Sequence, residues 1–430
     1  MRDVVIVAPS FTPTSNPPTQ RVRFFARHLP AFGWRPRVMS VDPRYYEEPA
    51  DTEIASLLPP GLEVLRTPAY PASLTRPFGV GDLGIRAYRP MRAALRRLCA
   101  RDRPALLFIP GPPWHTFLLG ADMRDEFGIP YVLDYIDPWV SSAGADGRWW
   151  TKAYWYRRVA VALEPRAVHG AARITAVSDG TNDGVRAMYP TLPASMFTGI
   201  PYGFEPTDFD TLRQRPRPHG LWPANDGALH IVSVGAMLPN GYETVRALFA
   251  GVRLLRETAP ALGMRIRLHF VGTTYEPTPR QLLVEPVARE MGLGEVVTEH
   301  PARVPYLDAL NLLCSADGIV ALGSSEAHYT ASKIFPSILA RRPLLAVYHA
   351  ASSVCDVVRR AHGGALVTYD DVDRAATRAP AIAAALEGLF APGGYDADAV
   401  RWDSFADYSA ERMTERLAKV FDAAAACASR

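Results

Sequence analysis

Apolar runs alternate with amphipathic segments through the first half of the chain. The run Val4–Ser10 is mostly apolar and ends in a Pro/Ser turn, and residues 20–34 follow with apolar positions at helical spacing. The alternation continues through the segments 35–42, 62–68, 104–115, 116–128, 130–139 and 172–180. Strands that alternate with helices in this way predict a parallel sheet covered by helices on both faces.

A second series of the same kind begins at Leu229–Leu238, an apolar strand that runs into a loop containing Gly235. A helix over 242–259 follows, and further segments continue the pattern at 266–274, 295–304, 306–316, 317–323 and 343–349. Two series predict an α/β chain with two Rossmann-like, doubly wound domains that face one another across a cleft. Ligands of open parallel sheets bind outside the carboxyl ends of the strands, so we expect the chemistry in that cleft.

The boundaries of the two predicted domains follow from changes in composition along the chain. We expect an N-terminal domain over 1–204, an interdomain linker over 205–227 that is rich in Pro and Arg, and a C-terminal domain over 228–398. Residues 399–430 hold a helix whose apolar positions need a partner surface: Met413, Leu417, Val420 and Phe421. We expect this helix to return to the N-terminal domain.

Composition narrows the class of protein. With 430 residues, 48% hydrophobic and 21% charged, the chain is typical of a globular enzyme. The net charge of +3 is too small to indicate a nucleic-acid partner. Four widely separated cysteines form no C-x-x-C pair, which argues against a zinc site and a disulfide framework and favours a cytoplasmic location. The apolar start is shorter than a signal-peptide core, and no run reaches the roughly 20 residues that span a bilayer.

Several loops resemble those of nucleotide-sugar glycosyltransferases of the GT-B fold, close to glycosyltransferase family 4. The similar segments are "PSFTPTSNPPTQRVRFFARHLPAFGW", "GPPWH" with "PYVLDYIDPW", "ITAVSDG", "PYGFEPTDF" and "SKIFPSILARRPLLAV". The resemblance covers nearly the whole chain. It implies that the first domain holds the acceptor, that the second holds a UDP- or GDP-sugar, and that the sugar is transferred with retention of anomeric configuration. It also implies that neither a cofactor nor a metal is needed, and "YDDVD" (369–373) is typical of a solvated loop.

Metal-free transfer requires positive charge from the protein on the leaving diphosphate. The chain has only three lysines, and one of them, Lys333, follows a polar turn within the "SKIF" segment. We expect Ser332 to cap the following helix, Lys333 to contact the diphosphate, and nearby backbone N–H groups to point at it. The alternative is an exposed lysine on a surface helix.

The second domain departs from the family at two places. The family pattern has two glutamates separated by seven residues, and counting back from the proline of "RRPLLAV" places them on His328 and Pro336. Glu326 is the nearby carboxylate, and His328 is a candidate for a sugar hydroxyl. The usual Arg and Lys are also missing from "GAMLPNGYET", where Gly235 still permits close approach of the backbone. We expect Thr273 and Arg303 to help bind the donor.

The candidate site residues of the first domain lie after its predicted strands. Asp137 is expected to orient an acceptor hydroxyl or support charge on the sugar, although it equally fits a turn cap, and His115 either binds a sugar or is structural. Four further candidates are expected at the acceptor side or the hinge: Arg21, Arg23, Gly203 and Glu205.

Two predicted helices, over 88–103 and 148–166, carry several arginines, and the second also interleaves three tryptophans with its cations. Both helices fit peripheral docking on an anionic membrane. The alternative is that the first has an ordinary solvated face and the second is an aromatic core helix. The acceptor is then a carbohydrate, a glycolipid or a small molecule. Two other functions stay open: a sugar-nucleotide epimerase on the same fold, and a non-catalytic sugar-nucleotide-binding protein.

Overall fold

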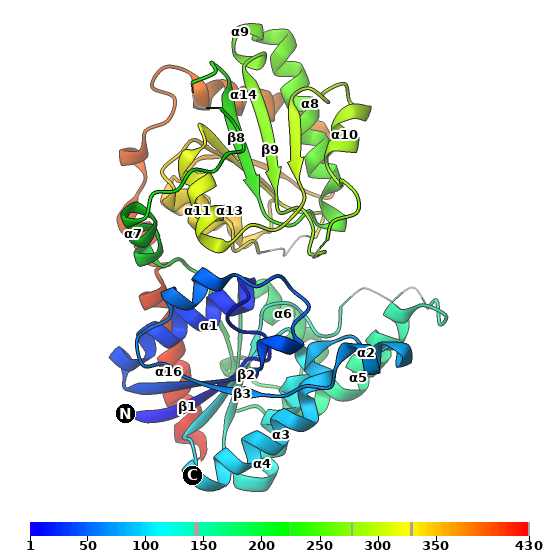
Figure 1. Ribbon diagram of the computed structural model, residues 1–430, viewed down its shortest axis with the longest axis vertical. Helices are drawn as coiled ribbons and strands as arrows, with labels where there is room; N and C mark the ends of the chain where they lie inside the picture. Colours follow the sequence, from blue (N-terminus) through cyan, green and yellow to red (C-terminus); the bar gives the residue numbers. More distant parts are fainter. Residues whose placement is uncertain (142–144, 146, 224, 277, 327–329, 429–430) are drawn as a thin grey trace. The chain divides into compact units, whose positions relative to one another are not determined.

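The computed structural model describes residues 1–430 except 142–144, 146, 224, 277, 327–329 and 429–430. The chain divides into two compact units (Figure 1). Unit 1 contains Met1–Tyr202 and Ala410–Arg430, and unit 2 contains Gly203–Ser409. Each unit is built around one parallel sheet, which confirms the predicted pair of Rossmann-like domains.

The sheet of unit 1 has the strand order β3-β2-β1-β4-β5-β6-β7, all parallel. Its strands are β1 (Arg2–Val7), β2 (Trp34–Val41), β3 (Glu63–Thr67), β4 (Leu106–Gly111), β5 (Tyr131–Tyr135), β6 (Arg173–Ala176) and β7 (Phe197–Gly199). Side chains alternate across a strand, and β1 shows both faces buried: Val5 and Val7 join one core cluster while Val4 and Ile6 join another. This is why the strand reads as one continuous apolar run.

Helices cover both faces of this sheet. The first cluster of core residues lies under α3 (Leu83–Asp102), α4 (Phe117–Phe127) and α5 (Lys152–Gly170). The second lies under α1 (Pro17–His28) and α16 (Ala410–Ala428). Three shorter elements are α2 (Ala72–Thr75), α6 (Asp179–Met188) and the 3₁₀ turn η4 (Arg76–Phe78). Helix α1 begins at Pro17, three residues before the predicted segment 20–34. Pro17 occupies one of its first two positions, and the Asn16 side chain accepts a hydrogen bond from the Thr19 N–H at 3.0 Å.

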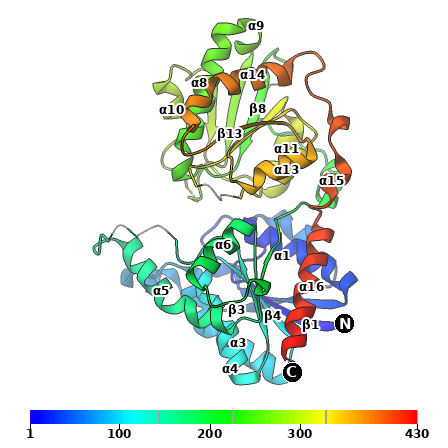
Figure 2. The ribbon, with the colours of Figure 1, turned by 180° about the vertical axis from the view of Figure 1, so that it is seen from behind.

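The C-terminal helix α16 belongs to unit 1. Met413, Leu417 and Phe421 are fully buried in the same cluster as Val22 and Phe25 of α1. Figure 2 shows α16 running beside α1 at the side of the sheet where both chain ends lie. The apolar stripe of the last helix is therefore covered by residues nearly 400 positions earlier in the chain.

The sheet of unit 2 has the order β10-β9-β8-β11-β12-β13, again parallel. Its strands are β8 (Leu229–Val234), β9 (Ile266–Val271), β10 (Val297–His300), β11 (Gly318–Leu322), β12 (Leu344–His349) and β13 (Ala365–Tyr369). The main helices are α8 (Tyr242–Thr258), α10 (Glu285–Glu290), α11 (Tyr306–Ser315), α12 (Ile334–Leu339), α13 (Ser353–Ala361) and α14 (Ala379–Phe390).

The segment 205–227, predicted as an interdomain linker, contains helix α7 (Pro206–Gln214) and falls within unit 2. Phe209 and Leu212 of α7 are buried, and Asp208 accepts a hydrogen bond from the Tyr306 hydroxyl at 2.9 Å. The composition of this segment is that of a linker, but its apolar positions at helical spacing attach it to α11.

Candidate functional site

The predicted donor residues of unit 2 gather at one edge of its sheet. Gly235 follows β8, Thr273 follows β9, Arg303 follows β10 and Glu326 follows β11. These four strands are neighbours, so the parallel topology brings the loops together. Strand β8 is also where the chain order reverses, with β9 on one side and β11 on the other, and this is the place where doubly wound sheets bind ligands.

Lys333 lies directly beside Gly235. A Cβ added to Gly235 would stand 3.8 Å from Cδ of Lys333, so the lysine side chain passes over the end of β8. Gly235 has φ +125°, a conformation that favours glycine. Burial lowers the pKa of the Lys333 ammonium from 10.5 to about 8, and no carboxylate of the described residues opposes that shift. A half-buried cation without a paired anion is suited to a negatively charged ligand.

The start of α12 differs from the prediction in one respect. Ser332 does not cap the helix; Lys333 occupies the cap position, without a side-chain capping bond. The Ser332 carbonyl instead accepts the Phe335 N–H at 3.4 Å, and Ala331 accepts the Ile334 N–H at 3.3 Å. Because α12 has only six residues and two of its first N–H groups are engaged, its N-terminus offers fewer free donors than the sequence suggested, and the Lys333 side chain is the cation at this point.

Two other donor candidates have partners inside unit 2. The Thr273 hydroxyl is buried and donates to Glu299, whose carboxylate also accepts the N–H groups of Leu283, Val284 and Glu285. Thr273 is thus part of a buried network that fixes this edge of the sheet. Arg303 lies over the ring of Tyr275, with 5.0 Å between the guanidinium carbon and the ring centroid, and is only partly exposed. The aromatic contact orients Arg303 while leaving its charge in place.

Glu326 is tied to the loop that follows β8. Its carboxylate accepts a hydrogen bond from the Asn240 side-chain amide at 3.0 Å, and the Ser325 N–H donates to the Asn240 carbonyl at 2.9 Å. The loops after β8 and β11 are therefore joined at the point where the strand order reverses. Pro336 stands in the first turn of α12, where a proline costs a helix little. His328 lies outside the described residues.

In unit 1 the structure brings His115 and Asp137 to neighbouring loops. His115 follows β4 and Asp137 follows β5, and the Trp114 indole N–H donates to the Asp137 carbonyl at 2.9 Å. The His115 ring packs edge-on against Trp139 and Tyr156 at centroid distances of 5.5 and 6.2 Å. Asp137 itself is exposed, two residues after the end of β5.

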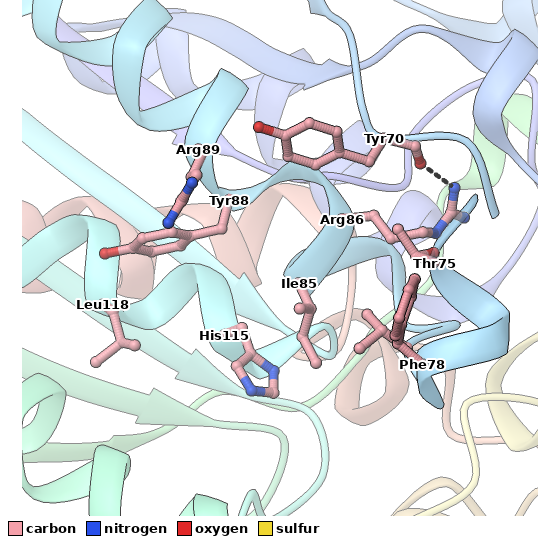
Figure 3. A pocket seen from close by; sticks show the side chains of 10 residues that line it. Tyr70, Thr75, Phe78, Ile85, Arg86, Tyr88, Arg89, His115 and Leu118 are labelled. Carbon is pink, nitrogen blue, oxygen red and sulfur yellow. Dashed lines mark hydrogen bonds between the residues drawn. The ribbon is translucent and has the colours of Figure 1, made fainter.

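His115 lines a cavity of about 400 Å³ within unit 1. The walls come from α3, from the segment around α2 and η4, and from the start of α4 (Figure 3). Burial lowers the pKa of His115 below its ordinary value, and Asp82, whose Oδ1 lies 3.9 Å from Nδ1, raises it by less. The imidazole is therefore neutral at neutral pH and available as a hydrogen-bond partner.

Arg21 and Arg23 do not reach an acceptor, contrary to the prediction. Both are almost fully buried. Arg21 forms a bidentate ion pair with Asp134 at 2.7 and 2.9 Å and donates to the Pro201 carbonyl at 3.0 Å, while Arg23 donates to Gln20. They occupy the inward face of α1, so the helix directs both guanidinium groups into the interior, where hydrogen bonds hold them.

Glu205 also has a structural role instead of the predicted acceptor role. It caps α7, accepting the Thr207 N–H at 3.2 Å and the Thr207 hydroxyl at 3.0 Å, and it is buried. Gly203 adopts φ +77°, which explains the glycine by backbone conformation. The residues around the His115 cavity were not predicted from the sequence, although the aromatic residues of "YPASLTRPF" were a readable signal.

No helix in the described part of the chain is long and apolar enough to cross a membrane. Among the described residues, no group of three or more His, Cys, Asp or Glu side chains is arranged to hold a metal ion.

Comparison with known proteins places these two units in a known fold. Residues 18–203 match the model of a family described as "Glycosyl transferase 4-like domain". No curated protein sequence matches the chain significantly.

Solved structures match over almost the full length. Anabaena Alr3699/HepE in complex with UDP and glucose has a TM-score of 0.63 at 15% identity, covering 98% of this chain and 100% of that one. A glycosyltransferase from Rickettsia africae ESF-5 has a TM-score of 0.60 at 13% identity, covering 98% of each chain. The UDP-GlcNAc 2-epimerase from Methanocaldococcus jannaschii has a TM-score of 0.55 at 12% identity, covering 98% of this chain and 99% of that one. The chain has the GT-B fold and resembles glycosyltransferases of family 4, and residues 18–203 of its first unit match the glycosyl transferase 4-like model.

Proposed function

We propose that the protein is a glycosyltransferase that moves a sugar from a UDP-sugar to an acceptor hydroxyl. Unit 2 binds the nucleotide-sugar and unit 1 binds the acceptor. The observation that carries this proposal is Lys333, a half-buried cation beside Gly235 at the strand-order reversal of unit 2. The complexes of Alr3699/HepE with UDP-glucose and with UDP favour uridine over guanosine as the donor base.

The proposed chemistry follows from the leaving group, which is UDP. As the bond between the anomeric carbon and the β-phosphate oxygen breaks, negative charge grows on the diphosphate, and the Lys333 ammonium stabilises it. Gly235 lets the backbone approach the phosphates, and Arg303 adds a second positive charge at the same edge of the sheet. In this proposal the transfer proceeds with retention of configuration and without a metal, since the protein's own cations replace one.

Asp137 and His115 act at the acceptor side. The neutral His115 imidazole accepts a hydrogen bond from the incoming hydroxyl, while Asp137, exposed at the end of β5, supports positive charge on the reacting sugar. Their loops are joined through Trp114, so the two side chains are positioned together.

The test is a screen of UDP- and GDP-sugars, read first as thermal stabilisation and then as release of free nucleotide. Stabilisation by a UDP-sugar, slow UDP release and transfer with the donor anomer retained are the expected results. Conversion to an epimeric UDP-sugar would instead establish the epimerase, a candidate favoured by the fold of the Methanocaldococcus enzyme. Stabilisation without turnover would establish a binding protein.

The same proposal includes peripheral contact of unit 1 with an anionic membrane. Three tryptophans at or near the start of α5 are more than half exposed, namely Trp149, Trp150 and Trp155. No acidic residue occurs between 147 and 163, whereas this stretch contains Arg148, Lys152, Arg157 and Arg158. Aromatic side chains interleaved with cations suit the headgroup region of a bilayer. Co-sedimentation with vesicles of phosphatidylglycerol, lost on Trp149→Ser and Trp155→Ser together, is expected; unchanged sedimentation would contradict it.

A further inference from the structure

The cavity beside His115 has a lining of distinct chemistry. Its walls are mostly apolar or aromatic, with Phe78, Val80, Ile85 and Leu118 contributing, and no Asp or Glu of the described residues lines it. Figure 3 shows Tyr88, Arg89 and Leu118 on one side, Thr75 and Phe78 on the other, and His115 below Ile85. A volume of about 400 Å³ is within the range of pockets that hold small molecules.

Arg86 and Arg89 both line this cavity, and they differ in what they contact. Arg86 is buried and donates to the carbonyls of Tyr70, Tyr45 and Gly81 at 3.0, 3.2 and 3.2 Å, which fixes the wall. Arg89, one helical turn further along α3, is exposed and has no hydrogen-bond or ion-pair partner among the described residues. The cavity thus presents one unneutralised cation at its margin.

The polar atoms at the base of the cavity point to a ligand as well. His115 is more than nine-tenths buried, yet its Nδ1 has no hydrogen-bond partner within the described chain. The hydroxyl of Thr75, which also lines the cavity, is buried without a partner among the same residues. Asp82 Oδ1 lies 3.9 Å from His115 Nδ1, which is beyond hydrogen-bond distance. Buried polar groups are nearly always hydrogen-bonded, so two groups without such a bond in the lining of one cavity point to a bound molecule that completes them.

The phenyl ring of Phe78 adds to this picture. It is 84% exposed and stands at the margin of the cavity. An exposed aromatic ring next to an apolar hollow provides a face on which a planar ligand stacks.

We propose that this cavity binds the acceptor, and that the acceptor is a small hydroxylated aromatic acid. Its ring lies between Phe78 and Ile85, its acidic group pairs with Arg89, and its hydroxyl is oriented by the His115 side of the cavity. The assignment of this ligand as the acceptor rests on the proposed glycosyltransferase function. In the reaction the acceptor oxygen forms a bond to the anomeric carbon, the bond to the β-phosphate oxygen breaks, UDP leaves with the electron pair, and the hydroxyl proton passes to the departing phosphate.

Binding by the full-length protein tests this without a donor. The probe is para-hydroxycinnamate, with the neutral para-hydroxycinnamamide and the polar acid gluconate as comparisons, followed by isothermal titration calorimetry. Para-hydroxycinnamate should bind at least about tenfold more tightly than either comparison, because only it offers both the ring and the charge.

Two variants at exposed positions separate the contributions without disturbing the fold. Arg89→Glu should weaken para-hydroxycinnamate about tenfold or more and leave the neutral amide within about twofold. Phe78→Ser should weaken both aromatic probes to a similar extent. The matched controls are Arg97→Glu, an exposed arginine two turns further along α3, and Val372→Ser, a 91% exposed apolar residue of unit 2; neither should alter binding.

Equal binding by wild type and both variants would overturn the inference, as would tighter binding of gluconate. Thermal stabilisation of the same proteins by UDP reports on the proposed function separately. If para-hydroxycinnamate binds as described but UDP does not, the glycosyltransferase proposal fails; if UDP binds but the variants have no effect, the acceptor inference fails.

Discussion

Replacing Lys333 by methionine tests the proposed mechanism most directly. Methionine keeps the length and much of the volume of the side chain but removes the ammonium beside Gly235. Loss of a preorganised group that stabilises developing negative charge costs about 10²- to 10³-fold in kcat. Release of UDP from a UDP-sugar that the wild type turns over should fall by that factor. The control is Lys419→Met, since Lys419 is exposed and pairs with Glu415 at 2.9 Å on α16, and the turnover of this variant should be unchanged.

The same substitution should make the protein more stable. Burial lowers the Lys333 pKa from 10.5 to about 8, and this difference corresponds to about 3 kcal/mol of unfavourable desolvation as an upper figure, since the side chain is only half-buried. Below pH 8 the lysine is charged in both folded and unfolded chains, so the cost is fully present. Between pH 8 and 10.5 the folded protein releases the proton first, and the cost declines.

Urea unfolding at pH 7 and at pH 10 measures this effect. Lys333→Met should exceed the wild type in free energy of unfolding at pH 7, and the difference should shrink at pH 10. In the wild type, kcat/KM for the UDP-sugar should also decrease as pH rises above about 8, because the free enzyme loses the ammonium. A variant that is less stable at pH 7 and turns over normally would refute the assignment of Lys333 as an unpaired, anion-binding cation.

Three further predictions concern stability. Asp134→Asn leaves the buried Arg21 guanidinium without its carboxylate. Urea titration should show a free energy of unfolding lower by about 3–5 kcal/mol. A change under about 1 kcal/mol, the value of a surface ion pair, would contradict the burial of this pair. Glu205→Ala removes the cap of α7 and should cost about 1 kcal/mol, with Glu205→Asp retaining most of it. His269 is buried with its pKa lowered to about 4, so the unfolded chain takes up its proton first on acidification; stability should fall from pH 6.5 towards pH 4, and His269→Gln should flatten this part of the profile.

The sequence predicted the fold because its signals are local. Continuous apolar runs such as that of β1, and apolar residues at helical spacing such as those of α1, identify elements wherever they lie. The alternation of strands and helices then leaves few topologies, since parallel crossovers have one hand. The segment 205–227 shows the limit of composition, because its Pro and Arg content suggested a linker while Phe209 and Leu212 anchor a helix.

The candidate site was predictable where a residue follows a strand of a parallel sheet. Gly235, Thr273, Arg303 and Glu326 were expected together because the carboxyl ends of neighbouring strands meet at one edge, and the structure places them there. The predicted acceptor role of Arg21 was wrong. The sequence shows an arginine after a loop, but it does not show whether that residue lies on the outward or the inward face of its helix.

The sequence by itself determined the two series of strands and helices, the apolar stripe of α16, and the placement of Lys333, one of only three lysines, in the "SKIF" segment. Each of these is set by neighbouring residues or by periodicity. Only the tertiary structure decided which partner each polar side chain meets. It paired Arg21 with Asp134, 113 residues away, and left Lys333 and Arg89 without a carboxylate partner among the described residues. The reason is physical: the energy of a charge depends on burial and on neighbours in space, and neither is written in the order of residues along the chain.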